Sequence, residues 1–238
     1  GERCSGTNYL EQLILANFDV KVTWRYGWKH FFGFHHLGNT DNTLFVCIVR
    51  DPVKWINSFY KTPHHVCSGC KKSQANFLNS EFYSNPDSWD SRKYYGPHYK
   101  IYGEDRHIYT KKRYKNIFEL RHTKLHFLLD DLPKKVKHYI LIRYEDLLHD
   151  FKRTMYKIRD TGLTVKLSIQ FPINCNKYSD DKYSDNKYSD NKSTMTTTEI
   201  VNEILDEILD EITDEITDGT VIYHPSFNEK YEKRLGYL

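Results

Sequence analysis

The first residues of the chain constrain its fold most. Gly1 and Gly6 are separated by four residues, and an apolar helix pattern begins after them at Tyr9. Glycines at this spacing let a backbone curl around a phosphate-like group at the N-terminus of a helix. In the Walker loop of ATP-binding proteins, the next two residues are a lysine for the γ-phosphate and a serine or threonine for magnesium. Thr7 and Asn8 stand there instead, so the stretch predicts an anion loop for a ligand with fewer charges and no magnesium.

Helical and strand patterns alternate along the chain to about residue 158. The continuous apolar run Leu44–Val49 is typical of a strand buried on both faces. Asp51 then caps a helix that Pro52 opens. The other predicted elements are strands at Phe18–Trp24 and Tyr139–Tyr144, and helices at Tyr9–Asn17, near 74–80, from Lys115 to a stop before Pro133, and from Asp146 to Ile158. This order predicts an α/β fold, a three-layer sandwich with a central parallel sheet, whose ligands bind at the carboxyl ends of the strands.

Length and repeats predict one domain with an insertion. A phosphate loop normally follows a buried strand, so we expect residues 1–238 to form a single domain that lacks its first strand. The insertion spans 175–219. Within it, 177–192 is a five-residue repeat without an apolar period, which predicts disorder. Residues 199–218 carry Ile or Leu at every fourth position among acidic residues, which predicts an acidic helix.

Charge and cysteine content narrow the partners and the location. Residues 1–150 hold 23 Lys and Arg against 16 Asp and Glu. This mild basic excess suits an anionic small molecule and leaves nucleic acid as the weaker alternative. No apolar run approaches the roughly 20 residues of a membrane span. The five cysteines lack the density of a secreted disulfide scaffold, so we expect reduced thiols and a cytoplasmic protein.

One polar loop contains residue types that bind metals. His64, His65, Cys67 and Cys70 lie close together in it. Structural zinc sites usually have longer His-to-Cys separations and a second paired element. We therefore predict no metal.

A second candidate anion site follows the Leu44–Val49 strand. Arg50 ends the strand, and Ser58 stands about two turns into the next helix. A guanidinium and a hydroxyl that converge beside a helix start can bind a second phosphate. The alternative for Arg50 is an ordinary ion pair at a strand end.

Together the two stretches resemble the donor-binding motifs of sulfotransferases that use 3′-phosphoadenosine 5′-phosphosulfate (PAPS). The stretches are Arg3-Cys4-Ser5-Gly6-Thr7-Asn8-Tyr9-Leu10 and Val49-Arg50-Asp51-Pro52-Val53-Lys54-Trp55-Ile56-Asn57-Ser58. In that family the first loop holds the 5′-phosphosulfate, and an Arg and a Ser with this spacing hold the 3′-phosphate. The resemblance implies that Ser5, Gly6, Thr7 and Asn8 bind the former, and that Arg50 and Ser58 bind the latter.

The resemblance covers residues 1 to about 158 and the last dozen. Arg143–Leu147 looks like the late strand-to-helix junction of the family, and Tyr231–Leu238 looks like its closing segment. A P-loop NTPase-like sulfotransferase fold is implied. The family usually has a basic residue immediately before Ser-Gly-Thr, whereas here Cys4 stands there and Arg3 is one position earlier. We include both in the expected donor site, where the long side chain of Arg3 would reach the sulfuryl oxygens. A nucleophilic Cys4 is the alternative.

Sulfuryl transfer needs a base for the acceptor proton and cations where negative charge grows. In the family the base is a His or Glu near the end of the second strand, often with a Lys nearby. The resemblance assigns His30 as the base and Lys29 as the charge stabiliser. A packed histidine at the edge of the core is the alternative for His30. The competing bases are His35, His36, Glu11 and Glu145.

These assignments predict a sulfotransferase that moves the sulfuryl group of PAPS to a hydroxyl or amine and releases 3′-phosphoadenosine 5′-phosphate (PAP). The acceptor is a small molecule, a carbohydrate, a lipid or a protein tyrosine, and the sequence does not choose among them. A nucleotide kinase or other P-loop NTPase is the alternative that Thr7 and Asn8 disfavour. A further alternative is a catalytically inactive relative that binds the nucleotide.

Overall fold

The computed structural model describes residues 1–23, 25–27, 29–30, 37–84, 105–166 and 224–238. The chain divides into two compact units, Gly1–Ile169 with Tyr223–Leu238, and Gln170–Ile222. Every described residue belongs to the first unit. The predictions for 177–192 and 199–218, and the alternative bases His35 and His36, lie outside the described residues.

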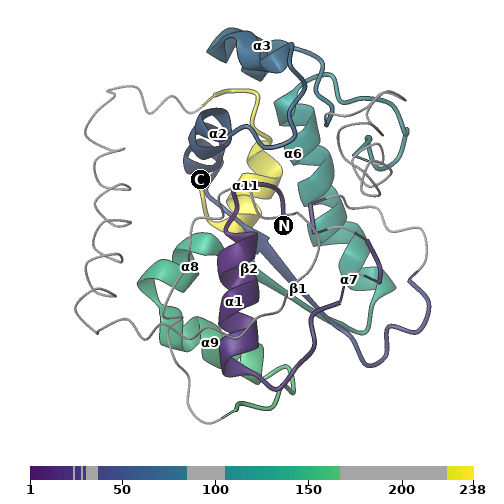
Figure 1. Ribbon diagram of the computed structural model, residues 1–238, viewed down its shortest axis with the longest axis vertical. Helices are drawn as coiled ribbons and strands as arrows, with labels where there is room; N and C mark the ends of the chain where they lie inside the picture. Colours follow the sequence, from purple (N-terminus) through teal and green to yellow (C-terminus); the bar gives the residue numbers. More distant parts are fainter. Residues whose placement is uncertain (24, 28, 31–36, 85–104, 167–223) are drawn as a thin grey trace, which may run out of the picture. The chain divides into compact units, whose positions relative to one another are not determined.

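The described part is an α/β structure. Strands β1 (Leu44–Val49) and β2 (His138–Arg143) pair in parallel, with Leu44 opposite His138 and Val49 opposite Arg143 (Figure 1). The predicted strand Leu44–Val49 is confirmed, and β2 begins and ends one residue before its prediction. The general α/β class is therefore confirmed for this part of the chain.

Helices make up most of the remaining described structure. Asp51 caps α2 (Pro52–Lys61) as predicted, because its Oδ1 accepts from the backbone N–H groups of Val53 and Lys54 at 2.9 Å. The first helix ends at Asn17 as predicted, and the helix near 74–80 is also confirmed. The helical segments are α1 (Thr7–Asn17), α2 (Pro52–Lys61), η1 (Cys70–Lys72), α3 (Gln74–Asn79), α6 (Ile117–His126), the π-helical turn η4 (Phe127–Asp131), α7 (Leu132–Lys135), α8 (Tyr144–His149), α9 (Phe151–Arg159) and α11 (Glu229–Leu235).

The predicted strand Phe18–Trp24 was wrong over its described residues. Phe18 forms only an isolated antiparallel bridge with Val165, and residues 19–23 are not in a strand. The N–H of Asp19 bonds to the carbonyl of Thr164, and the N–H of Lys166 bonds to that of Asn17. Among the described residues the pairing extends no further, so the alternating pattern of residues 18–23 does not make a strand there.

Two helix boundaries also differ from prediction. The helix after Lys115 does not stop before Pro133, because α6 runs through the π-helical turn η4 into α7, and Pro133 lies in the first turn of α7, where proline is tolerated. Asp146 does not cap a helix. It lies inside α8, and its carboxylate accepts from Arg143 Nη2 at 2.6 Å.

The core consists of clusters on both faces of the sheet. Successive strand residues point to opposite faces. Ile48 and Ile142 pack with α1, α8 and α9, whereas Cys47 and Val49 pack with α6, η4, α7 and α11. A third cluster joins α2, α3 and α6 around Trp55. Helices therefore contact both faces of the two strands.

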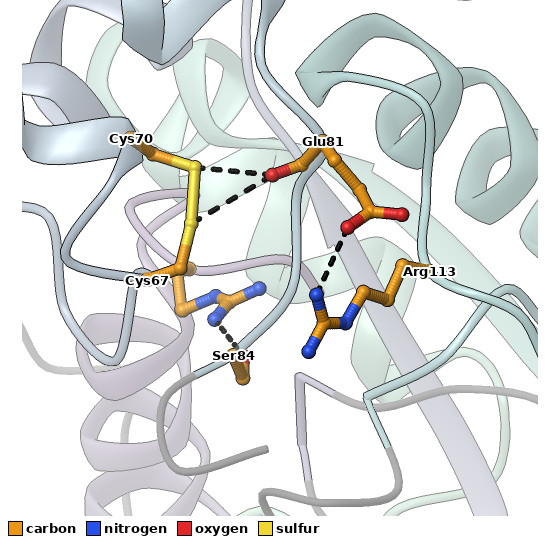
Figure 2. The surroundings of a disulfide bond; sticks show 6 residues. Cys67, Cys70, Glu81, Ser84 and Arg113 are labelled. Atoms are coloured by element: carbon orange, nitrogen blue, oxygen red, sulfur yellow. Dashed lines mark hydrogen bonds and ion pairs between the residues drawn. A yellow bond between two sulfur atoms is a disulfide. The ribbon is translucent and has the colours of Figure 1, made fainter. Parts of the chain in front are cut away.

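Cys67 and Cys70 form a disulfide in the segment between α2 and α3 (Figure 2). Their sulfurs lie 3.8 and 3.3 Å from the carbonyl oxygen of Glu81. The prediction that all five cysteines are reduced was wrong for this pair, because the turn brings their α-carbons to 5.6 Å, within disulfide range. Cys4 and Cys47 carry free thiols.

The prediction of a cytoplasmic protein depended on reduced cysteines. Cys67 and Cys70 form a disulfide, so this pair does not support that prediction. In the described ranges, no helix has both the length and the apolar character needed to cross a membrane. Location beyond that stays a prediction.

Candidate functional site

The loop Gly1–Gly6 lies at the carboxyl ends of both strands and leads into α1 (Figure 1). An added Cβ at Gly1 would lie 2.4 Å from the carbonyl oxygen of Ile48, and one at Gly6 would lie 2.2 Å from the ring of Tyr144. Cys4 and Gly6 both have left-handed backbone conformations, with φ of 59° and 80°. Such conformations are costly for a residue with a side chain and concentrate at ligand sites. The loop is therefore tightly curled where strand ends and a helix start meet.

The N-terminus of α1 can bind an anion. Its N-cap residue is Gly6, which has no side chain to accept from the first N–H groups of the helix. By contrast, Asp51 and Asn116 cap α2 and α6 with their side chains. The first N–H groups of a helix lack intrahelical acceptors, and the helix dipole favours negative charge beside them.

Arg50 and Ser58 both lie beside this loop. Arg50 Nη1 donates to the carbonyl oxygen of Cys4 at 3.3 Å, and the guanidinium carbon lies 4.8 Å from the centroid of the Tyr144 ring. The Ser58 hydroxyl lies close to the Cys4 thiol and acts to lower the pKa of that thiol. The thiol also lies 3.7 Å from the carbonyl oxygen of Thr62. The structure thus brings residues of the two motifs together beside Cys4.

Lys29 also reaches the loop. Its Nζ donates to Asn8 Oδ1 in the first turn of α1 and lies 3.6 Å from Glu11 Oε2. Burial lowers the pKa of Lys29, against the opposing attraction of Glu11. Lys29 therefore places a cation at the start of α1, and the alternative base Glu11 is engaged with it.

His30 lies at the beginning of the loop with a defined tautomer. Its Nδ1 is 3.0 Å from the carbonyl oxygen of Gly1. Because a carbonyl can only accept, Nδ1 carries the hydrogen and Nε2 is the basic nitrogen. Burial lowers the pKa of His30 well below 6.5, so the ring is neutral at pH 7. A neutral imidazole can take a proton at Nε2.

The guanidinium of Arg3 points into the core instead of the anion loop. Only 1% of Arg3 is exposed. Its Nε donates to Glu2 Oε1 at 2.8 Å, its Nη2 to Asp105 Oδ2 at 2.7 Å, and its Nη1 to Ser84 Oγ at 2.6 Å. Phe59 lies 5.0 Å from the same group. These contacts give Arg3 a structural role beneath the loop. We therefore do not include it among the proposed ligand contacts.

Lys124 completes this buried charge cluster, which sequence reasoning missed. Its Nζ donates to Glu2 Oε2, to Asp105 Oδ1 at 3.0 Å and to the carbonyl oxygen of His30 at 2.7 Å. Glu2 and Lys124 therefore connect the loop to the His30 segment. The one signal in the sequence was a lysine on the apolar stripe of the helix after Lys115, because a buried lysine requires partners.

Two alternatives from the sequence lose support. Burial raises the pKa of the Cys4 thiol to about 11, so a thiolate nucleophile is absent at neutral pH. The sulfurs of Cys67 and Cys70 bond to each other, which removes the thiolates that the zinc alternative needs. Across the described ranges, no cluster of three or more His, Cys, Asp and Glu side chains is placed to hold a metal ion.

The late junction and the closing segment meet beside Arg50. Glu145 accepts from the backbone N–H of Asp51 and from the Tyr237 hydroxyl, both at 2.8 Å. Both of its oxygens are thus engaged, which disfavours Glu145 as a base. Arg121 donates to the Arg50 carbonyl at 2.9 Å and pairs with Glu232 of α11. The C-terminal helix therefore holds the strand end in place.

No protein-family model, curated protein or solved structure gives a significant match to this chain. Its function must therefore be argued from the site. The described residues bring the start of α1 together with two cations, Arg50 and Lys29, and with the Ser58 hydroxyl. This combination favours an anionic ligand with more than one charged group.

Proposed function

We propose that this chain is a sulfotransferase that uses PAPS as its donor and a hydroxyl or amine as its acceptor. The observation that carries the proposal is the convergence of Arg50 and Ser58 on the Gly1–Gly6 loop. The proposal includes a P-loop-like three-layer sandwich, which is supported by helices on both faces of β1 and β2.

The proposed donor contacts follow from the positions of the donors and cations. Backbone N–H groups of Gly6, Thr7 and Asn8 would bind the 5′-phosphosulfate at the start of α1. Arg50 and Ser58 would bind the 3′-phosphate through a charge-assisted hydrogen bond and a hydroxyl. Bound there, PAPS would supply an activated sulfuryl group.

In this proposal the catalytic residues are His30 and Lys29, which lie beside the loop. His30 would hold the proton of the acceptor hydroxyl at Nε2, because its Nδ1 already donates to Gly1. Lys29 would stabilise the negative charge that develops near the start of α1. Asn8 positions Lys29 for that role by accepting its hydrogen bond.

Calorimetric titration with PAP tests the donor site. We expect PAP to bind without magnesium and to raise the melting temperature. Arg50→Ala should weaken PAP binding by roughly tenfold to a hundredfold, because a hydrogen bond to a charged group contributes about 1.5–3 kcal/mol. Ser58→Ala should weaken it less. Arg113→Ala is the control, because Arg113 pairs with Glu81 on a partly exposed surface (Figure 2).

The outcome separates the proposal from its rivals. No binding at saturating PAP, or equal affinity for Arg50→Ala and Arg113→Ala, would contradict the donor site. Magnesium-dependent ATP turnover would instead support a P-loop NTPase. Incubation with sulfur-labelled PAPS and a broad acceptor panel then tests transfer, and PAP binding without transfer to any acceptor would favour an inactive relative.

A further inference from the structure

The peptide group that joins Arg50 to Asp51 is held at both of its polar ends. Its carbonyl oxygen, which belongs to Arg50, accepts from Arg121 Nη2 at 2.9 Å. Its N–H, which belongs to Asp51, donates to Glu145 Oε1 at 2.8 Å. A peptide group is planar, so hydrogen bonds at its two ends fix the orientation of the whole plane. The plane cannot rotate without breaking one of these bonds.

This peptide group lies at the junction between β1 and α2. The strand ends at Val49 and the helix begins at Pro52, so a rotation at the junction would change the angle between them. Arg50 lies on the strand side of the peptide group, and Ser58 lies on the helix. The orientation of this one peptide group therefore affects the relative positions of the two side chains that would bind the 3′-phosphate.

The C-terminal segment holds both of the side chains that bind this peptide group. Glu232 of α11 accepts from Arg121 Nε and Nη2 at 2.7 and 2.8 Å. Tyr237 donates its hydroxyl to Glu145 Oε2 at 2.8 Å. Arg121 is only 6% exposed, and its guanidinium carbon lies 4.9 Å from the centroid of the Trp55 ring. A planar guanidinium with buried partners on its edge and an aromatic ring on its face has little freedom to move.

We propose that Arg121 and Glu145 are positioning residues of the donor site, and that Glu232 and Tyr237 hold them in place for that role. Both residues act through the peptide group between Arg50 and Asp51 and not through a contact with the donor. A phosphate gains more from groups that are already in position, because binding then orders fewer side chains. This role rests on the proposed function, and it makes the affinity for PAP depend on the C-terminal segment.

Tyr237→Phe tests the Glu145 side of this arrangement through the loss of a single hydroxyl. Tyr139→Phe is the matched control, because Tyr139 is also partly buried and donates its hydroxyl to the Leu128 carbonyl oxygen at 2.7 Å. Calorimetric titration should show about fivefold weaker PAP binding for Tyr237→Phe and unchanged affinity for Tyr139→Phe. Urea unfolding should give similar stabilities for the two variants, so the difference in affinity is not an effect of folding.

The double variant Arg121→Met/Glu232→Leu tests the Arg121 side. Replacement of both partners of a buried ion pair by apolar residues is often nearly neutral for stability, whereas the Arg50 carbonyl loses its donor. We expect about tenfold weaker PAP binding. When Arg50→Ala is already present, the same replacement should weaken binding by less than about twofold, because the relative positions of Arg50 and Ser58 then no longer matter.

The outcomes distinguish the positioning role from the donor site itself. If the wild type does not bind PAP, the donor site is contradicted, and the positioning role with it. If the wild type binds PAP and Arg50→Ala weakens that binding, but Tyr237→Phe and Arg121→Met/Glu232→Leu keep full affinity, only the positioning role is overturned. An equal loss from Arg121→Met/Glu232→Leu with and without Arg50→Ala would also overturn it, since the replacement would then act elsewhere.

Discussion

The backbone of Gly6 packs directly against the ring of Tyr144, where an added Cβ would lie 2.2 Å from ring atom Cδ2. Gly6 also has a φ of +80°, which disfavours any side chain. The same ring lies 4.8 Å from the guanidinium carbon of Arg50. Tyr144 therefore contacts both the loop and Arg50, so the shape of the loop and the position of Arg50 are coupled.

Gly6→Ala should therefore damage the loop. Strain at a left-handed residue costs of the order of 1–3 kcal/mol, to which the clash with Tyr144 adds. We expect a lower free energy of unfolding in urea titrations and weaker PAP binding. Gly69→Ala is the matched control, because Gly69 has a φ of −62° and nothing within 4 Å of an added Cβ. A Gly6→Ala variant as stable as Gly69→Ala would contradict the packing.

The sequence carried enough local information for the elements that hold the site. Leu44–Val49 is apolar at every position, and Asp51 with Pro52 marks the following helix start, so both boundaries could be read directly. Arg50 directly follows β1, and its spacing to Ser58 placed Ser58 within α2. Their meeting with the loop was predictable only because parallel strands bring their carboxyl ends together.

Other features depend on distant residues and have no local signal. Arg3 is buried by Asp105 and Ser84, which stand 102 and 81 positions later. Nothing in the sequence around Arg3 indicates these partners, so the family pattern suggested a ligand contact. The predicted helix end before Pro133 was wrong for a different reason. The π-helical turn before it creates a new first helical turn in which proline is tolerated.

Arg3→Met should cost about 3–5 kcal/mol of stability, because it leaves buried carboxylates without their cation. Glu2 and Asp105 are the carboxylates concerned. Arg113→Met provides the comparison, since an exposed ion pair contributes about 1 kcal/mol or less. Urea unfolding of both variants measures the difference. Equal losses in the two variants would show that Arg3 is not part of a buried cluster.

The same cluster predicts a loss of stability in acid. Burial would raise the pKa of Glu2, but the attraction of Arg3 and Lys124 outweighs it and lowers the pKa to about 2, from an ordinary value of 4.5. A carboxyl whose pKa is lowered by folding stabilises the fold fully at a pH above its pKa in the unfolded chain. This contribution disappears as the pH falls from 4.5 toward 2. The stability gap between the wild type and Glu2→Gln should therefore narrow over that range. A constant gap would contradict the ionised state of Glu2.

The disulfide should resist alkylation and contribute modestly to stability. Iodoacetamide added under denaturing conditions without reductant should modify Cys4 and Cys47 but leave Cys67 and Cys70 unmodified. The bond closes a very short loop, so its loss should cost only about 2 kcal/mol by the loop-entropy relation. Urea unfolding of Cys67→Ala/Cys70→Ala measures that cost. Peptide mapping that finds Cys67 alkylated without reductant would contradict the bond.

His30→Ala should separate catalysis from donor binding. His30 contacts the loop through Gly1 but makes none of the proposed phosphate contacts, so PAP affinity should change little. Loss of a general base should reduce the transfer rate by about 10²–10⁴-fold. Burial lowers the pKa of His30 well below 6.5, so the base stays neutral as the pH falls through that value. The acid limb of the rate profile should accordingly lie below pH 6.5. If His30→Ala still binds PAP and transfers the sulfuryl group at an unchanged rate, another group must take the proton of the acceptor.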